Sequence, residues 1–107
     1  MDKDTEQKVA RLQLIEQNMQ NFAMQKQQFQ AQIFDIDAAM EELKDSEESY
    51  KIIGNIMVKA KKEMLEKELK EKKDMFELRI KAIEKQENQL KDKSKELQKE
   101  VLDNIKE

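Results

Sequence analysis

Apolar side chains recur at alternating spacings of three and four residues in the first part of this chain. Over residues 12 to 43, nine of ten positions in this pattern are apolar: Leu12, Ile15, Met19, Phe22, Phe29, Ile33, Ile36, Met40 and Leu43. A 3.5-residue repeat keeps such a stripe facing one partner helix, so it predicts a coiled-coil helix over about residues 4 to 44. Asp4 and Gln7 fit a capping box at its start. At the exception, Lys26, we expect the stem to follow the seam and the ammonium to reach water, although a polar seam residue can also fix the register.

A second heptad stretch, over residues 66 to 101, has a weaker seam. A heptad seam has two positions, each of which recurs every seven residues. One of them is apolar throughout: Leu69, Phe76, Ile83, Leu90 and Leu97. The other position is mostly polar: Glu66, Lys73, Ile80, Glu87, Ser94 and Val101. The stretch predicts a second helix over about residues 60 to 105. Only seven of its eleven seam positions are apolar, so its seam is too narrow to cover all the apolar surface of the first helix. The remaining apolar surface of the first helix must be covered by something else or stay partly open.

The missing residue types exclude most chemistry. The 107 residues include no Cys, His, Trp or Pro and a single Gly, while 21 are basic and 24 acidic. Without Cys or His the chain lacks Cys/His metal sites, cysteine nucleophiles and Ser-His pairs, and one Gly cannot build a phosphate-binding loop. We therefore expect no enzyme activity, no metal and no cofactor.

The charge distribution and the N-terminal residues bear on partners and location. Residues 1 to 50 carry 5 basic and 11 acidic groups and residues 51 to 107 carry 16 and 13, so neither half resembles a nucleic-acid binder. The chain begins without the apolar stretch of a targeting signal. Together with the absence of cysteine, this predicts a cytoplasmic protein that binds neither nucleic acid nor membranes.

A change of pattern separates the two heptad stretches. Small and acidic residues from Asp45 to Ser49 come first, and β-branched residues follow around the pair Gly54-Asn55: Ile52, Ile53, Ile56 and Val58. Because these side chains suit strands and Gly54 accepts the positive φ of a two-residue turn, the segment predicts a β-hairpin. The alternative makes Gly54 an interruption in one continuous helix, at a cost of only about 1 kcal/mol.

Two arms of similar length around a β-hairpin predict a chain that folds back on itself. The expected fold class is mainly α: a long antiparallel α-helical coiled-coil hairpin with one β-hairpin at the bend. We expect a single domain, residues 1–107, with helix one at 1–45, the hairpin linker at 46–59 and helix two at 60–107. Antiparallel pairing would bring together Leu43 and Leu65, Phe29 and Arg79, and Val9 and Val101.

The hairpin also predicts oligomerisation. An isolated two-stranded hairpin is marginally stable in water, and its unpaired edges are templates for further strands. Apolar side chains on both faces exceed what one coiled-coil end can cover, so we expect hairpins of several subunits to join in a shared sheet or β-barrel. The expected oligomerisation residues are Tyr50, Ile52, Ile53, Gly54, Asn55, Ile56, Met57 and Val58.

Nearly the whole chain resembles β-class subunits of prefoldin, also called GimC, of the archaeal type. Tyr50-Lys51, Gly54 and Val58-Lys59 match that family's YKxxGxxxVK hairpin segment, and Phe76 to Glu87 is similar to its second helix. The resemblance implies a hetero-hexamer of two α-class and four β-class subunits, with a β-barrel body and coiled-coil tentacles. It also implies an ATP-independent chaperone, or holdase, that passes unfolded polypeptide clients to a group II chaperonin.

A holdase needs exposed apolar surface, and the free ends of the two arms are candidates for it. The expected client-binding residues are Val9, Leu12, Leu14, Ile15, Leu97, Val101, Leu102 and Ile105. Leu14 and Leu102 lie off the seam, and for these two and Ile105 client contact is favoured over core packing. Four of the eight are ordinary seam residues that could equally be core alone: Leu12, Ile15, Leu97 and Val101. The alternative function is a structural coiled-coil scaffold that binds no client.

Overall fold

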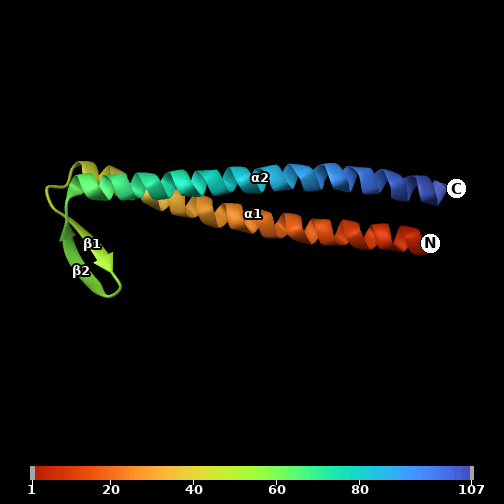
Figure 1. The fold of residues 1–107 in the computed structure, drawn as a ribbon, viewed down its shortest axis with the longest axis horizontal. Coiled ribbons are helices and arrows are strands. Elements are labelled where there is room, and N and C mark those ends of the chain that lie inside the picture. The colour runs from red at the N-terminus through yellow and green to blue at the C-terminus, as the bar shows by residue number, and fades with distance from the viewer. Residues whose placement is uncertain (1, 107) are drawn as a thin grey trace. The chain divides into compact units, whose positions relative to one another are not determined.

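The computed structural model describes residues 2–106, which form four elements (Figure 1). Helix α1 spans Lys3–Lys44, strands β1 and β2 span Ser49–Ile53 and Ile56–Ala60, and helix α2 spans Lys62–Lys106. The predicted fold class, mainly helical with one β-hairpin between two long helices, is confirmed. In the described part of the chain, no helix has the composition needed to cross a membrane.

The chain divides into two compact units, which we describe one at a time. The hairpin unit comprises residues 28–80, and the terminal unit joins the residues up to 27 with those from 81 onward. Each helix contributes to both units. Within each unit, one segment of α1 faces one segment of α2.

In the hairpin unit, β1 and β2 pair antiparallel from Ser49 opposite Ala60 to Ile53 opposite Ile56. Gly54 has a φ of 61°, and no other described residue has a positive φ. A positive φ at only the first of the two turn residues is typical of a type II′ turn, whose twist suits paired strands. The alternative of a continuous helix through Gly54 is therefore wrong. Ala60 still belongs to β2, which delays the start of α2 to Lys62.

The seam of the hairpin unit is apolar at its centre. Ile36, Leu43 and Phe76 are buried, and the rings of Phe29 and Phe76 stack with centroids 5.6 Å apart. The guanidinium of Arg79 lies 5.8 Å from the Phe29 centroid, which confirms the expected proximity of these two residues. At a polar seam position, Lys73 Nζ lies 2.7 Å from Asp37 Oδ1.

The terminal unit combines buried apolar residues with polar seam contacts. Ile15, Ile83 and Leu97 are buried, and Lys26 Nζ lies 2.7 Å from Glu87 Oε1. The Lys26 ammonium therefore pairs across the seam instead of simply reaching water, because the facing seam position carries a carboxylate.

The start of α1 differs from the predicted capping box at Asp4. The Thr5 amide donates a hydrogen bond of 2.8 Å to Asp2 Oδ1, so Asp2 is the capping residue and the helix begins at Lys3. Thr5 is only 2% exposed, and the Asn104 side-chain amide of α2 donates to its hydroxyl over 3.2 Å.

Candidate functional site

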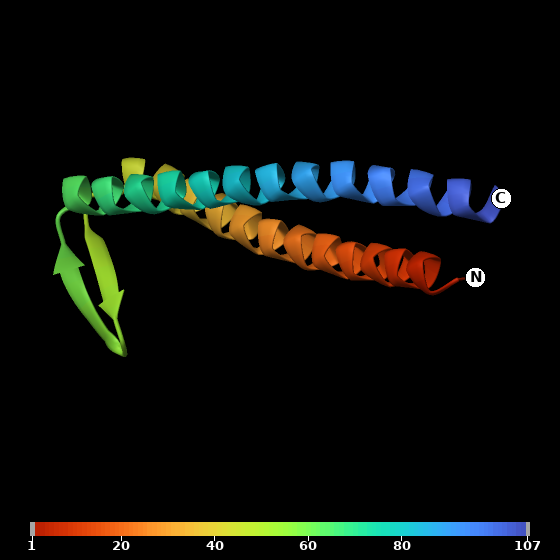
Figure 2. The ribbon, with the colours of Figure 1, turned by 45° about the vertical axis from the view of Figure 1, so that its right-hand side comes forward.

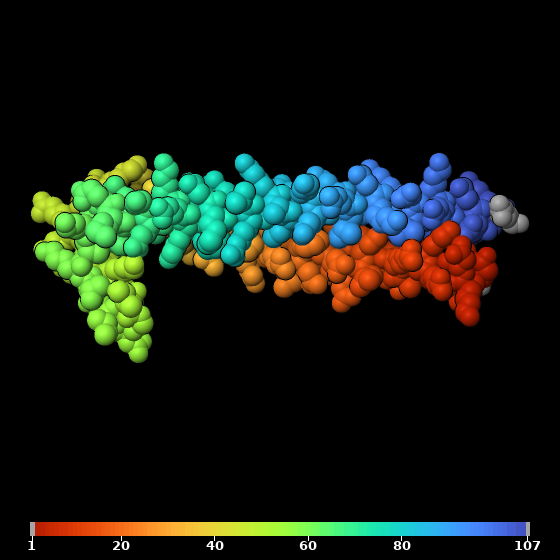
Figure 3. All heavy atoms as spheres, viewed as in Figure 1, coloured from red at the N-terminus to blue at the C-terminus, as the bar shows by residue number. Residues whose placement is uncertain are grey.

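Both faces of the β-hairpin are open in the single chain. Ile52 lies opposite Met57, and Ile53 lies opposite Ile56. Cross-strand partners share a face and successive pairs alternate, so the two pairs lie on opposite faces. All four side chains are between 58% and 72% exposed. The space-filling view shows the hairpin standing away from the helices of its own unit (Figure 3).

The base of the hairpin is fixed while its turn is left free (Figure 2). Lys51 Nζ lies 2.9 Å from a carboxylate oxygen of Glu68 on α2, and Lys62 Nζ donates to the Lys44 carbonyl over 2.7 Å. The Tyr50 hydroxyl donates to Glu48 Oε2 over 2.7 Å, and this bond raises the pKa of Tyr50. The Lys51–Glu68 pair thus ties β1 to α2, and the Lys62–Lys44 bond joins the two helix ends beside it.

The predicted client-binding residues lie in the terminal unit, and they differ widely from one another in how exposed their side chains are. Leu14, Leu102 and Ile105 are 57%, 56% and 61% exposed. Ile15 and Leu97 are buried in the seam. The remaining three are partly buried: Val9, Leu12 and Val101. In the single chain, exposed apolar surface thus comes mainly from the off-seam residues.

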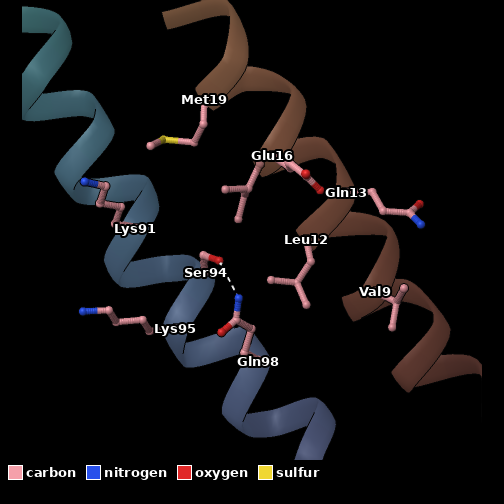
Figure 4. Close-up of a pocket in the computed structure, with 10 residues that line it drawn as sticks. Val9, Leu12, Gln13, Glu16, Met19, Lys91, Ser94, Lys95 and Gln98 are labelled. Atoms are coloured by element: carbon pink, nitrogen blue, oxygen red, sulfur yellow. Dashed lines mark hydrogen bonds between the residues drawn. The ribbon is translucent and has the colours of Figure 1, made fainter. Parts of the chain in front are cut away.

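A groove of about 610 Å³ opens between α1 and α2 in this unit, and we call it the terminal groove (Figure 4). Its apolar lining comes from α1: Val9, Leu12, Ile15 and Met19. Figure 4 shows the side chains of Leu12 and Met19 pointing toward α2. Ser94, a small residue at a seam position of α2, stands on the other side and leaves the space unfilled.

Polar residues line the two rims of the terminal groove. Gln13 and Glu16 come from α1, and Lys91, Lys95 and Gln98 come from α2. The Gln98 amide donates to Ser94 Oγ over 3.3 Å. Sequence reasoning missed these rim residues as site residues. The sequence did contain a signal for them: Ser94 is a small polar residue at a seam position of the second heptad stretch, and the seam that it faces is mostly apolar.

The exposed apolar residues do not form one patch. On α2, Lys91, Lys95, Gln98, Leu102 and Ile105 follow one another at intervals of four, three, four and three residues, so they share one helix face. Leu102 and Ile105 therefore continue the rim of the terminal groove. On α1, Leu14 lies about 140° around the helix from the groove residue Val9, so it belongs to another side.

Two lysines of the terminal unit form ion pairs with carboxylates of the same unit. A hydrogen bond to Asp4 raises the pKa of Lys8, which also lies 3.5 Å from Glu100. The bond to Glu87 likewise raises the pKa of Lys26. Among residues 2–106, no group of three or more acidic side chains is placed to hold a metal ion.

Comparisons with known proteins agree on one family. The family model described as "Prefoldin subunit" matches residues 6–107. The prefoldin subunit beta of Archaeoglobus fulgidus is 42% identical over 96 residues, covering 87% of this chain and 83% of the relative. That of Thermococcus onnurineus is 37% identical, covering 80% and 77%.

A solved structure supports the same assignment. The crystal structure of the prefoldin beta subunit from Thermococcus strain KS-1 matches with a TM-score of 0.91 and 28% identity, covering 99% of this chain and 96% of that one. Sequence and fold thus agree over nearly the full length, and this chain belongs to the prefoldin family, in which its relatives are β subunits.

Proposed function

We propose that this chain is the β-class subunit of a cytoplasmic, ATP-independent chaperone that captures unfolded polypeptide and passes it to a group II chaperonin. The observation that carries the proposal is the hairpin, whose apolar side chains are open on both faces. A surface of this kind is typical of a chain that functions in a larger assembly. Family membership supports the chaperone role, and no enzyme activity, metal or cofactor is part of it.

The assembly forms through the hairpins. Four β-class and two α-class subunits contribute strands to a shared β-barrel, which covers both faces and pairs the free edges. Burying each of Ile52, Ile53, Ile56 and Met57 contributes about 1.5 to 3 kcal/mol relative to leaving it exposed. Tyr50, Gly54, Asn55 and Val58 complete this surface.

Client capture takes place at the ends of the terminal unit. Leu14, Leu102 and Ile105 are exposed and offer apolar contact directly. Val9, Leu12, Ile15, Leu97 and Val101 become accessible when the helix ends fray, since end turns open at low free energy. Each contact is weak, and several subunits must engage one client for useful affinity. Weak individual contacts also allow release.

The capture step is tested with an unfolded enzyme whose aggregation is followed by light scattering. The assembled complex should suppress scattering without nucleotide, and Leu14→Ser/Leu102→Ser/Ile105→Ser should weaken the suppression several-fold. Leu78→Ser, at a residue 69% exposed on the α2 segment of the hairpin unit, is the matched control and should have no effect. Full suppression by the triple variant would refute capture at these three residues, whereas no suppression by the wild-type complex would favour the scaffold that binds no client.

The assembly step is tested by native mass spectrometry of this chain mixed with an α-class subunit. We expect a complex of two α and four β chains. Ile52→Lys/Met57→Lys should abolish it, because two charges would be buried on one face of the barrel. Met64→Lys, at a residue 60% exposed on α2, makes the same change outside the hairpin and should leave the complex intact. A hexamer formed by the double variant would refute assembly through this face.

A further inference from the structure

The terminal groove exists because a small polar residue occupies a seam position. Ser94 stands where a larger side chain would fill the space beside Leu12 and Met19. In the hairpin unit, by contrast, two large side chains meet across the seam, where the rings of Phe29 and Phe76 stack with centroids 5.6 Å apart. The terminal groove is thus an opening in the seam with an apolar lining, large enough for side chains of another polypeptide.

The α2 rim of the groove is basic. Lys91 and Lys95 are exposed and lie one helical turn apart, a like-charge spacing that is mildly unfavourable in itself. Among residues 2–106, neither ammonium has a carboxylate within 4.0 Å, whereas Lys8 and Lys26 of the same unit are paired. Glu16, on the opposite rim, is the one carboxylate among the residues that line the groove.

The two lysines can reach a ligand at the mouth of the groove. Figure 4 shows their stems along the α2 rim and their ammonium groups directed away from α1. Exposed side chains change rotamer within nanoseconds, so this direction is one of several that each lysine samples. The same face of α2 continues to Leu102 and Ile105, which extends the apolar surface past the basic pair.

We propose that the terminal groove selects unfolded segments in which an acidic side chain neighbours an apolar one, an inference that rests on the proposed chaperone function. The apolar side chain enters beside Leu12 and Met19, and the neighbouring carboxylate pairs with Lys91 or Lys95. A segment with a basic residue at that place meets like charges on this rim and binds more weakly. The groove therefore sorts clients by charge as well as by apolar content.

The test uses the full chain assembled with an α-class subunit and three fluorescent peptides of equal length. All three share the same spaced leucines, flanked by Glu in the first, Gln in the second and Lys in the third. Fluorescence anisotropy at low salt should show the Glu peptide binding about fivefold more tightly than the Lys peptide, the size expected for two exposed ion pairs. High salt should shrink this ratio toward one.

Two pairs of substitutions locate the effect. Lys91→Gln/Lys95→Gln should abolish the preference for the Glu peptide and leave the affinity for the Gln peptide unchanged. Lys85→Gln/Lys99→Gln removes the same charge from the outward side of the same α2 segment and should preserve the preference. Ser94→Leu fills the groove and should weaken binding of all three peptides, with circular dichroism confirming that the helices remain.

The outcomes separate this inference from the function on which it rests. If the Gln peptide binds and aggregation is suppressed, but the Glu and Lys peptides bind equally, the charge selection is wrong and the chaperone function stands. If both double variants lose the preference for the Glu peptide equally, the preference comes from net charge, and the terminal groove is not the site of selection. If no peptide binds and aggregation proceeds, the proposed function itself fails.

Discussion

At the scale of the residue, Asp2 makes the start of α1 sensitive to acid. Hydrogen bonding from Thr5 holds the pKa of Asp2 below its ordinary value of 3.8. A carboxylate whose pKa is lowered by folding stabilises the helix above pH 3.8, and this contribution is lost as the pH falls through the lowered value. The Thr5 amide shift in NMR should therefore titrate with a midpoint below 3.8. Asp2→Asn keeps a capping oxygen and should remove the titration, and a wild-type midpoint at or above 3.8 would contradict the cap.

The ion pair between Lys26 and Glu87 predicts a non-additive pair of substitutions. Glu87 is only 12% exposed at its side chain, so Lys26→Met leaves a poorly solvated carboxylate without its partner and should lower the Tm by a few degrees. Lys26→Met/Glu87→Met replaces both charges with apolar groups and should restore the Tm or raise it. Lys93→Met is the control, because its pair with Glu96 is exposed and 4.0 Å long. If the change in Tm of the double variant equals the sum of the changes in Lys26→Met and Glu87→Met, the two residues do not couple.

The seam could be predicted from the sequence, and the polar contacts across it could not. The 3.5-residue repeat alone determines which side chains face the partner helix, including polar ones such as Glu87 and Ser94. Which lysine meets which carboxylate depends on the exact antiparallel alignment, and the repeat leaves that open. The position of the cap differs from the prediction for a related reason: Asp2 and Asp4 are both capping residues by type, and only the geometry of the first helical turn decides between them.

At the scale of the element, two neighbouring positions of α2 should respond very differently to truncation. Phe76 is 9% exposed and stacks on Phe29, whereas Leu78 is 69% exposed. Phe76→Ala should lower the free energy of unfolding by about 3 kcal/mol, since it leaves a cavity in the seam. Leu78→Ala should change it by less than about 0.5 kcal/mol. Chemical denaturation followed by circular dichroism measures both, and similar losses would contradict the assigned faces.

The turn of the hairpin gives a second prediction for an element. Gly54 has a φ of 61°, and a β-carbon added there would meet no atom within 4 Å, so Gly54→Ala causes no clash and acts through backbone strain alone. We expect the hairpin to lose about 1 to 2 kcal/mol of conformational stability. The complex with the α-class subunit should weaken, and the helix content should not change. Asn55→Ala, at the turn position without a positive φ, is the control. Equal weakening by both substitutions would argue against the type II′ turn.

For the molecule as a whole, the sequence predicts that the second helix leaves some apolar surface of the first helix uncovered, but it does not predict where that surface lies. A count of seam positions shows that the first heptad stretch has a larger share of apolar residues there than the second. The terminal groove arises only where Ser94 comes opposite long side chains of α1, and the basic rim arises because Lys91 and Lys95 share its face. The open faces of the hairpin were predictable, because alternation along five-residue strands places isoleucines on both sides.

The proposed capture by several weak sites predicts how mixed assemblies behave. Complexes are formed from wild-type chain and the Leu102→Ser/Ile105→Ser variant in varied proportions, and suppression of aggregation is measured for each mixture. If several arm ends must hold one client, the loss of one end removes more than its share of affinity, so suppression should fall faster than the fraction of wild-type chain. Mixtures with Leu78→Ser should show no decline. A decline strictly proportional to the variant fraction would mean that each arm end acts independently, and the multivalent mechanism would be wrong.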